Sequence, residues 1–157
     1  MFKELINHNG NGRERPELNG AYTAIFRGVS QRQRPTFETR NDPKPTLEDV
    51  FVFEFEVIDA DFGEPIRVSK WVRKPARLSH PGKSGKVTNL YRVLAALYGV
   101  SAMTDAQLER AEEFVQEAVG REYQLTIETK PSGWYEIVHI APVRARLRKT
   151  KEDEVPF

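Results

Sequence analysis

The sequence of 157 residues contains no cysteine and only three histidines. Without cysteine there is no disulfide framework, no thiolate metal site and no cysteine nucleophile. His8, His80 and His139 are scattered along the chain, so their spacing does not indicate a zinc site. We therefore expect neither a bound metal nor a cofactor.

Long apolar runs are also missing. No run approaches the roughly 20 residues that a membrane-spanning helix needs. The first residues, Met1-Phe2-Lys3-Glu4, do not have the pattern of a signal peptide. Hydrophobic residues make up 39% of the chain and charged residues 30%, which is typical of a soluble globular domain. We expect a cytoplasmic protein with no membrane partner.

The sequence lacks a recognisable catalytic motif. Gly82-Lys83-Ser84 is similar to the end of a phosphate-binding loop, but that motif needs a glycine at position 77, which is arginine. Asp59, Asp61 and Glu64 lie close together near an expected turn, where carboxylates are common. A small metal-dependent nuclease remains a weaker hypothesis on these carboxylates. We predict a binding protein and not an enzyme.

One stretch contains no acidic residue. Residues 67–86 include no Asp or Glu, although the whole chain has a net charge of only +1. Seven basic residues lie there: Arg67, Lys70, Arg73, Lys74, Arg77, Lys83 and Lys86. Such a stretch predicts a local binding surface for a polyanion, and the alternative is an ordinary solvated face.

The first half of the chain predicts three strands. Residues 20–29 are rich in β-forming side chains, and Gly28 marks a possible bulge. Residues 30–49 are polar and contain several prolines, which predicts a long connection. Alternating phenylalanines predict a strand over 50–60, and a turn then leads into its hairpin partner over 66–73.

The second half predicts helices followed by strands. Apolar residues recur at helical spacing in residues 87–98, and a capping box at Thr104 begins a second helix over 104–118. Strands are predicted over 121–129 and 134–143, with a turn between them.

This order predicts the fold class. Three strands, a helical insert and two strands indicate an all-β domain with a helical insert, namely a five-stranded OB-fold Greek-key barrel with two helices between strands three and four. We assign residues 1–19 to a flexible N-terminal arm and 20–143 to the OB-fold nucleic-acid-binding domain. Residues 144–157 form a basic linker and an acidic tip.

Binding of a single strand needs cations for its phosphates and flat rings for its bases. Trp71 is predicted to lie on the same face of its strand as Arg67 and Arg73. Lys70 falls among residues that are expected to point inward, so either a bulge follows Val68 or the Lys70 stem extends to the rim. Trp134 and Tyr135 point to opposite sides of one strand, and which of them is exposed stays open. The predicted nucleic-acid-binding residues are Arg32, Arg34, Phe37, Phe62, Arg67, Lys70, Trp71, Arg73, Lys74, Arg77, Lys83, Lys86 and Trp134.

The last six residues read Glu-Asp-Glu-Val-Pro-Phe. They resemble the acidic tip of bacterial and phage single-stranded DNA-binding proteins, which typically end Asp-Asp-Asp-Ile-Pro-Phe. The resemblance implies binding of single-stranded DNA without strong sequence preference, in replication, repair and recombination. It also implies that partner proteins are recruited by the tip, namely by Glu152, Asp153, Glu154, Val155, Pro156 and Phe157.

The chain departs from the usual bacterial pattern in its short linker, its double helical insert and its long acid-poor loop over residues 78–86. These departures suggest a phage or mobile-element relative, acting in a bacterial or phage-infected cell, and they leave a homodimer open. The main alternative function is an OB-like adaptor whose basic surface binds an acidic protein.

Overall fold

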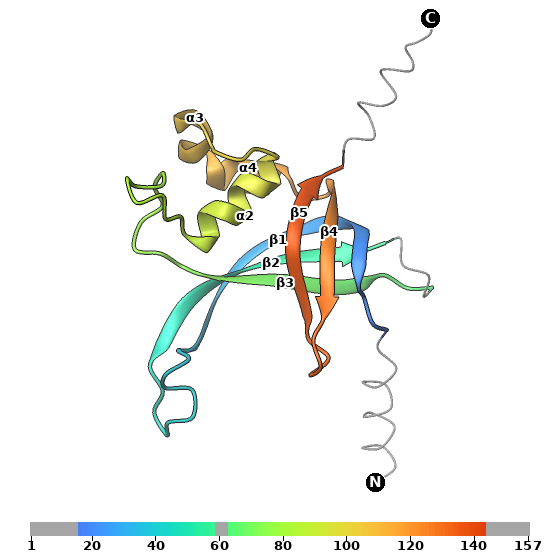
Figure 1. Ribbon diagram of the computed structural model, residues 1–157, viewed down its shortest axis with the longest axis horizontal. Helices are drawn as coiled ribbons and strands as arrows, with labels where there is room; N and C mark the ends of the chain where they lie inside the picture. The colour runs from blue at the N-terminus through green and yellow to red at the C-terminus, as the bar shows by residue number, and fades with distance from the viewer. Residues whose placement is uncertain (1–15, 59–62, 144–157) are drawn as a thin grey trace, which may run out of the picture.

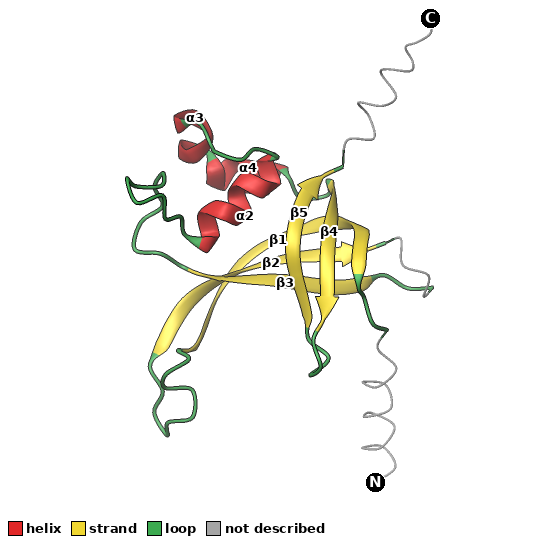
Figure 2. Ribbon diagram, viewed as in Figure 1, coloured by secondary structure: helices red, strands yellow, loops and turns green. Residues whose placement is uncertain are grey.

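The computed structural model describes residues 16–58 and 63–143. In this part of the chain, five strands form one antiparallel sheet in the order β3-β2-β1-β4-β5 (Figure 1). The strands are β1 (Gly20–Pro35), β2 (Leu47–Val57), β3 (Ile66–Arg73), β4 (Glu122–Thr129) and β5 (Tyr135–Pro142). Helices α2 (Asn89–Tyr98), α3 (Asp105–Glu109) and α4 (Ala111–Glu117) lie between β3 and β4 (Figure 2). The predicted mostly-β architecture with a helical insert after the third strand is confirmed.

The two edge strands of the sheet approach one another. Lys70 on β3 donates a hydrogen bond from Nζ to the backbone oxygen of Ile137 on β5, at 2.9 Å. The sheet therefore curls enough for a side chain of one edge strand to reach the backbone of the other.

A β-bulge in β1 divides that strand into two parts. The register between β1 and β2 shifts between Phe26 and Gly28, as the glycine predicted. Gly28 has a φ of 124°, a backbone conformation that other residues rarely adopt. Residues 20–25 pair with β4 and residues 24–26 pair with β2, whereas the residues after the bulge pair with β2 alone.

The predicted connection over residues 30–49 is too long at both ends, because residues 30–35 and 47–49 belong to strands. Both strands continue, and their pairing runs to Pro35 opposite Leu47, so that residues 36–46 make the turn. This hairpin extends beyond the rest of the sheet, at the lower left of Figure 1. The sequence hides these strand ends because arginine–glutamate pairs, such as Arg34 with Glu48, replace the usual apolar alternation.

The core lies on the inner face of the curled sheet, and α2 and α4 add buried side chains to it. The alternating phenylalanines of β2 behave as predicted, since Phe53 and Phe55 are buried. The Phe55 ring centroid lies 5.2 Å from that of Phe26 and 6.1 Å from that of Tyr123. Leu18, which we assigned to the arm, also packs here, because it is fully buried and its N–H donates to Thr129 Oγ1 at 2.8 Å.

The helical insert contains one break that the sequence did not indicate. The Thr104 capping box with Gln107 forms as expected. At Arg110, however, φ and ψ are −102° and 19°, so the predicted helix over 104–118 becomes α3 and α4, and the insert has three helices in place of two. After this turn, Ala111 and Val115 are buried. No helix in the described ranges has the length and apolar character that crossing a membrane requires.

Because Phe55 is fully buried and Phe37 is 73% exposed, the same substitution should affect stability strongly at Phe55 and hardly at all at Phe37. Phe55→Ala should lower the free energy of unfolding by about 3–5 kcal/mol through loss of packing and a residual cavity. Phe37→Ala should change it by no more than about 0.5 kcal/mol. Urea unfolding followed by circular dichroism measures both, and similar losses would contradict the placement of these rings.

Candidate nucleic-acid interface

A groove of about 560 Å³ brings together residues from three parts of the chain. It lies where the β1–β2 hairpin, β3 and the β4–β5 turn meet, and both turns are on the lower side of the body in Figure 1. We call it the tryptophan groove, and its lining residues are Arg34, Ser69, Lys70, Trp71, Lys130, Trp134, Tyr135, Glu136 and Ile137. Four of the predicted binding residues, namely Arg34, Lys70, Trp71 and Trp134, therefore share one site.

The two tryptophans supply the flat surfaces of this groove. Trp71 is half-buried on β3, whereas Trp134, next to the first residue of β5, is 54% exposed. Tyr135 is 4% exposed and packs in the core, so the structure answers the question that the alternation left open. An exposed indole beside a polar groove is suited to stack on another planar group.

Lys130, which the sequence analysis did not select, also lines the groove. Its Nζ lies 2.9 Å from Glu136 Oε1 and 3.5 Å from Glu128 Oε1. The hydrogen bond with Lys130 lowers the pKa of Glu136, and the same contact raises the pKa of Lys130. In the sequence, the signal for Lys130 was its position in the predicted turn between the last two strands.

Lys70 is half-buried, and its amine bonds Ile137 rather than extending freely into solvent. The pairing of β2 with β3 runs without a register shift, so the alternative of a bulge after Val68 is excluded. Its charge is thus fixed at the wall of the groove.

Arginines and glutamates alternate across the outer face of β1, β2 and β3. Glu54 contacts Arg32 on one side at 3.3 Å and Arg67 on the other at 3.2 Å. Glu48 likewise contacts Arg34 at 2.9 Å and Arg73 at 3.0 Å. We call these two triplets the arginine–glutamate rows.

These rows change the expected character of the surface. Glu54 is not a free carboxylate, because it binds two of the predicted phosphate-binding arginines. Hydrogen bonding from Arg34, reinforced by Arg73, lowers the pKa of Glu48 against the opposing effect of burial, so its carboxylate stays charged at neutral pH. The sequence could not reveal these pairs because they depend on the cross-strand register.

The outer face also covers apolar side chains. Val50 and Val52 are buried there, and Val52 lies opposite Trp71 in the β2–β3 register. The Arg32 guanidinium carbon is 6.0 Å from the centroid of the Trp71 ring, at the limit of a cation–π contact. The rows and the tryptophan groove therefore form adjacent parts of one surface.

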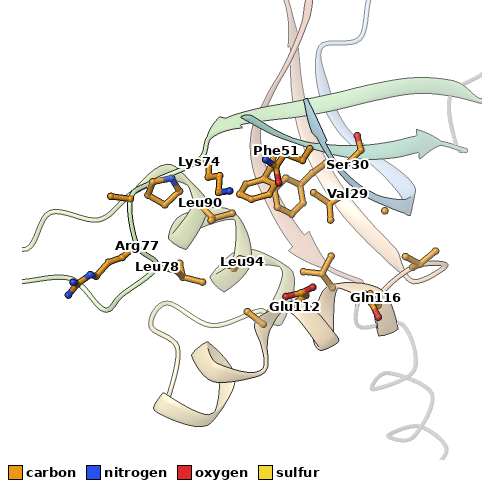
Figure 3. Close-up of a pocket in the computed structure, with 18 residues that line it drawn as sticks. Val29, Ser30, Phe51, Lys74, Arg77, Leu78, Leu90, Leu94, Glu112 and Gln116 are labelled. Carbon is orange, nitrogen blue, oxygen red and sulfur yellow. The ribbon is translucent and has the colours of Figure 1, made fainter. Parts of the chain in front are cut away.

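The remaining cations of the basic stretch lie elsewhere. Lys74, Arg77, Lys83 and Lys86 are exposed in the loop after β3, and no carboxylate of the described residues pairs with them. Lys74 and Arg77 line a second groove of about 690 Å³, where Phe51 of the sheet faces Leu90 and Leu94 of α2 (Figure 3). The stretch over 67–86 is thus divided between two regions.

The other predicted residues lie at or beyond the margins of this surface. Phe37 is exposed at the end of the β1–β2 hairpin, with the Arg40 guanidinium carbon 3.9 Å from its ring centroid. Phe62, Asp59 and Asp61 lie outside the described residues, as do the tip residues 152–157. Across residues 16–58 and 63–143, no three potential metal-ligating side chains form a group that could hold an ion.

No family model matches the chain, and a search of curated proteins gives no significant match.

The different exposure of the two tryptophans has a direct spectroscopic consequence. Trp71→Phe leaves Trp134 as the single emitter, and we expect red-shifted fluorescence that acrylamide quenches readily. Trp134→Phe leaves the half-buried Trp71, whose emission should lie at shorter wavelength and be quenched less. N-acetyltryptophanamide serves as the fully exposed reference, and equal quenching of the two variants would contradict the described groove.

Proposed function

We propose that the chain binds single-stranded DNA without strong sequence preference, through the tryptophan groove. The observation that carries this proposal is the meeting of Trp71 and Trp134 in one groove with Arg34 and Lys130 at its margin. Single-strand binding of this kind combines aromatic surfaces for bases with cations for phosphates, and it needs no reading of base edges. In this proposal each indole stacks on a base, while Arg34 and Lys130 contact the connecting backbone.

We further propose that the curled sheet is a barrel of the OB type. The strand order and the approach of the edge strands at Lys70 and Ile137 support this assignment. In that fold, nucleic acid binds on strands two and three between the loops that follow strands one and four. The tryptophan groove lies among the corresponding elements, namely the β1–β2 hairpin, β3 and the β4–β5 turn.

The cellular role that we propose rests on the sequence resemblance. In this role the chain covers exposed strands during replication, repair or recombination in a bacterial or phage-infected cell. Recruitment of partner proteins is assigned to residues 152–157, which lie outside the described residues.

A protein-binding adaptor is the second candidate function. The larger, mainly apolar groove beside α2 and α4 favours it, because apolar side chains from the sheet and from the helices meet there below two basic residues. An adaptor of this kind would not distinguish single-stranded from duplex DNA by stacking.

Truncation of either indole tests the proposed stacking. Trp71→Ala and Trp134→Ala should each weaken binding to oligo-dT by about 1–3 kcal/mol, the cost of losing one base–aromatic contact. Fluorescence anisotropy of a labelled oligo-dT measures the change. Val138→Ala is the control, because Val138 is 44% exposed but does not line the groove. Unchanged affinity in both tryptophan variants would reject the groove as the binding site.

A further inference from the structure

The arginine–glutamate rows present their charges at different depths. The Glu48 and Glu54 side chains are 14% and 28% exposed, whereas their arginine partners are between 39% and 67% exposed. The arginines are therefore accessible to an approaching phosphate, and the carboxylates lie behind them.

Each carboxylate divides its two oxygens between two arginines. Glu54 uses Oε2 for Arg32 and Oε1 for Arg67, and Glu48 uses Oε2 for Arg34 and Oε1 for Arg73. A row keeps a net positive charge, since it holds two arginines and one glutamate. That charge is smaller than the arginines alone would give, and their guanidinium groups are held in place by the shared carboxylate.

We infer that Glu48 and Glu54 act as built-in counterions that set the preference for single-stranded over duplex DNA. This inference rests on the proposed function. The two glutamates limit how strongly the arginines bind phosphate, so phosphate contacts alone give weak attachment. Bound DNA must then supply a second contribution, which is the stacking of unpaired bases on the tryptophans.

Single-stranded and duplex DNA respond differently when the glutamates weaken phosphate binding by the arginines. Duplex DNA keeps its bases stacked inside the helix, so it offers this surface mainly phosphates, at high charge density. A single strand has a lower charge density but offers its base faces to aromatic rings. Weakening the phosphate contribution therefore reduces duplex binding more than single-strand binding.

The arginine–glutamate rows lie next to the tryptophan groove, so one bound strand can contact both. Arg34 belongs to one row and also lines the tryptophan groove. Arg32, in the other row, lies beside the Trp71 ring. A strand that stacks on the tryptophans consequently passes over arginines whose charge is already partly neutralised.

Glu54→Gln and Glu48→Gln test the inference. Neutralising one carboxylate should free the arginines for about one additional phosphate contact. At about 50 mM salt, the affinity for duplex DNA should then rise about tenfold, and the slope of its logarithm against log salt should steepen by about 0.9. Affinity for oligo-dT should rise less, so the ratio of single-strand to duplex affinity falls. Anisotropy titrations at several salt concentrations measure all of these values.

Two further variants separate this role from other effects of charge. Glu54→Asp keeps the carboxylate and should retain the wild-type slope and the wild-type selectivity. Glu122→Gln makes the same charge change on β4, where no ion pair of the described residues involves Glu122. Its duplex affinity should remain close to that of the wild type.

The outcomes are distinct. If the glutamates merely stabilise the hairpin, the Gln variants will bind duplex DNA as weakly as the wild type or more weakly, which overturns the inference. An equal gain in Glu122→Gln also overturns it, because net charge would then explain the effect. Absence of wild-type binding to oligo-dT overturns the proposed function and, with it, this inference. Wild-type binding with unchanged Gln variants overturns the inference alone.

Discussion

The bulge at Gly28 is the constraint on which the rest of the structure depends. Before it, β1 lies inside the sheet between β2 and β4, and Phe26 packs against Phe55 and Tyr123 in the core. After it, β1 leaves β4 and continues with β2 alone as a projecting hairpin. One glycine with a positive φ therefore connects the apolar core to the polar surface that carries the candidate site.

The charges of that surface determine how strongly it attracts phosphate groups. A chain with a net charge of +1 has little general attraction for nucleic acid, and its outer-face arginines are further balanced by glutamates on β2. In the proposed function, such a surface would bind phosphates moderately and leave the discrimination between single-stranded and duplex DNA to stacking. The more strongly basic loop after β3 is separate from this balance and adjoins the apolar groove instead.

The sequence predicted the elements that follow simple periodic rules. Alternating phenylalanines placed β2 and its buried face, and the glycine at position 28 indicated the bulge. The outer half of β1 was missed because Arg32 and Arg34 find their glutamate partners only through the strand register. The break at Arg110 was missed since no glycine or proline marks it. The tryptophans were selected one by one, but their meeting depends on the curl of the sheet, which no local pattern encodes.

The central claim is that Trp71 and Trp134 belong to one DNA-binding groove. Ultraviolet crosslinking of the full chain to oligo-dT, followed by mass spectrometry of the attached peptides, tests it most directly. The account predicts crosslinks in both β3 and the β4–β5 turn, at Trp71 and Trp134 themselves. Crosslinks confined to the loop after β3 and to α2 would contradict it, because they would place the strand in the other groove.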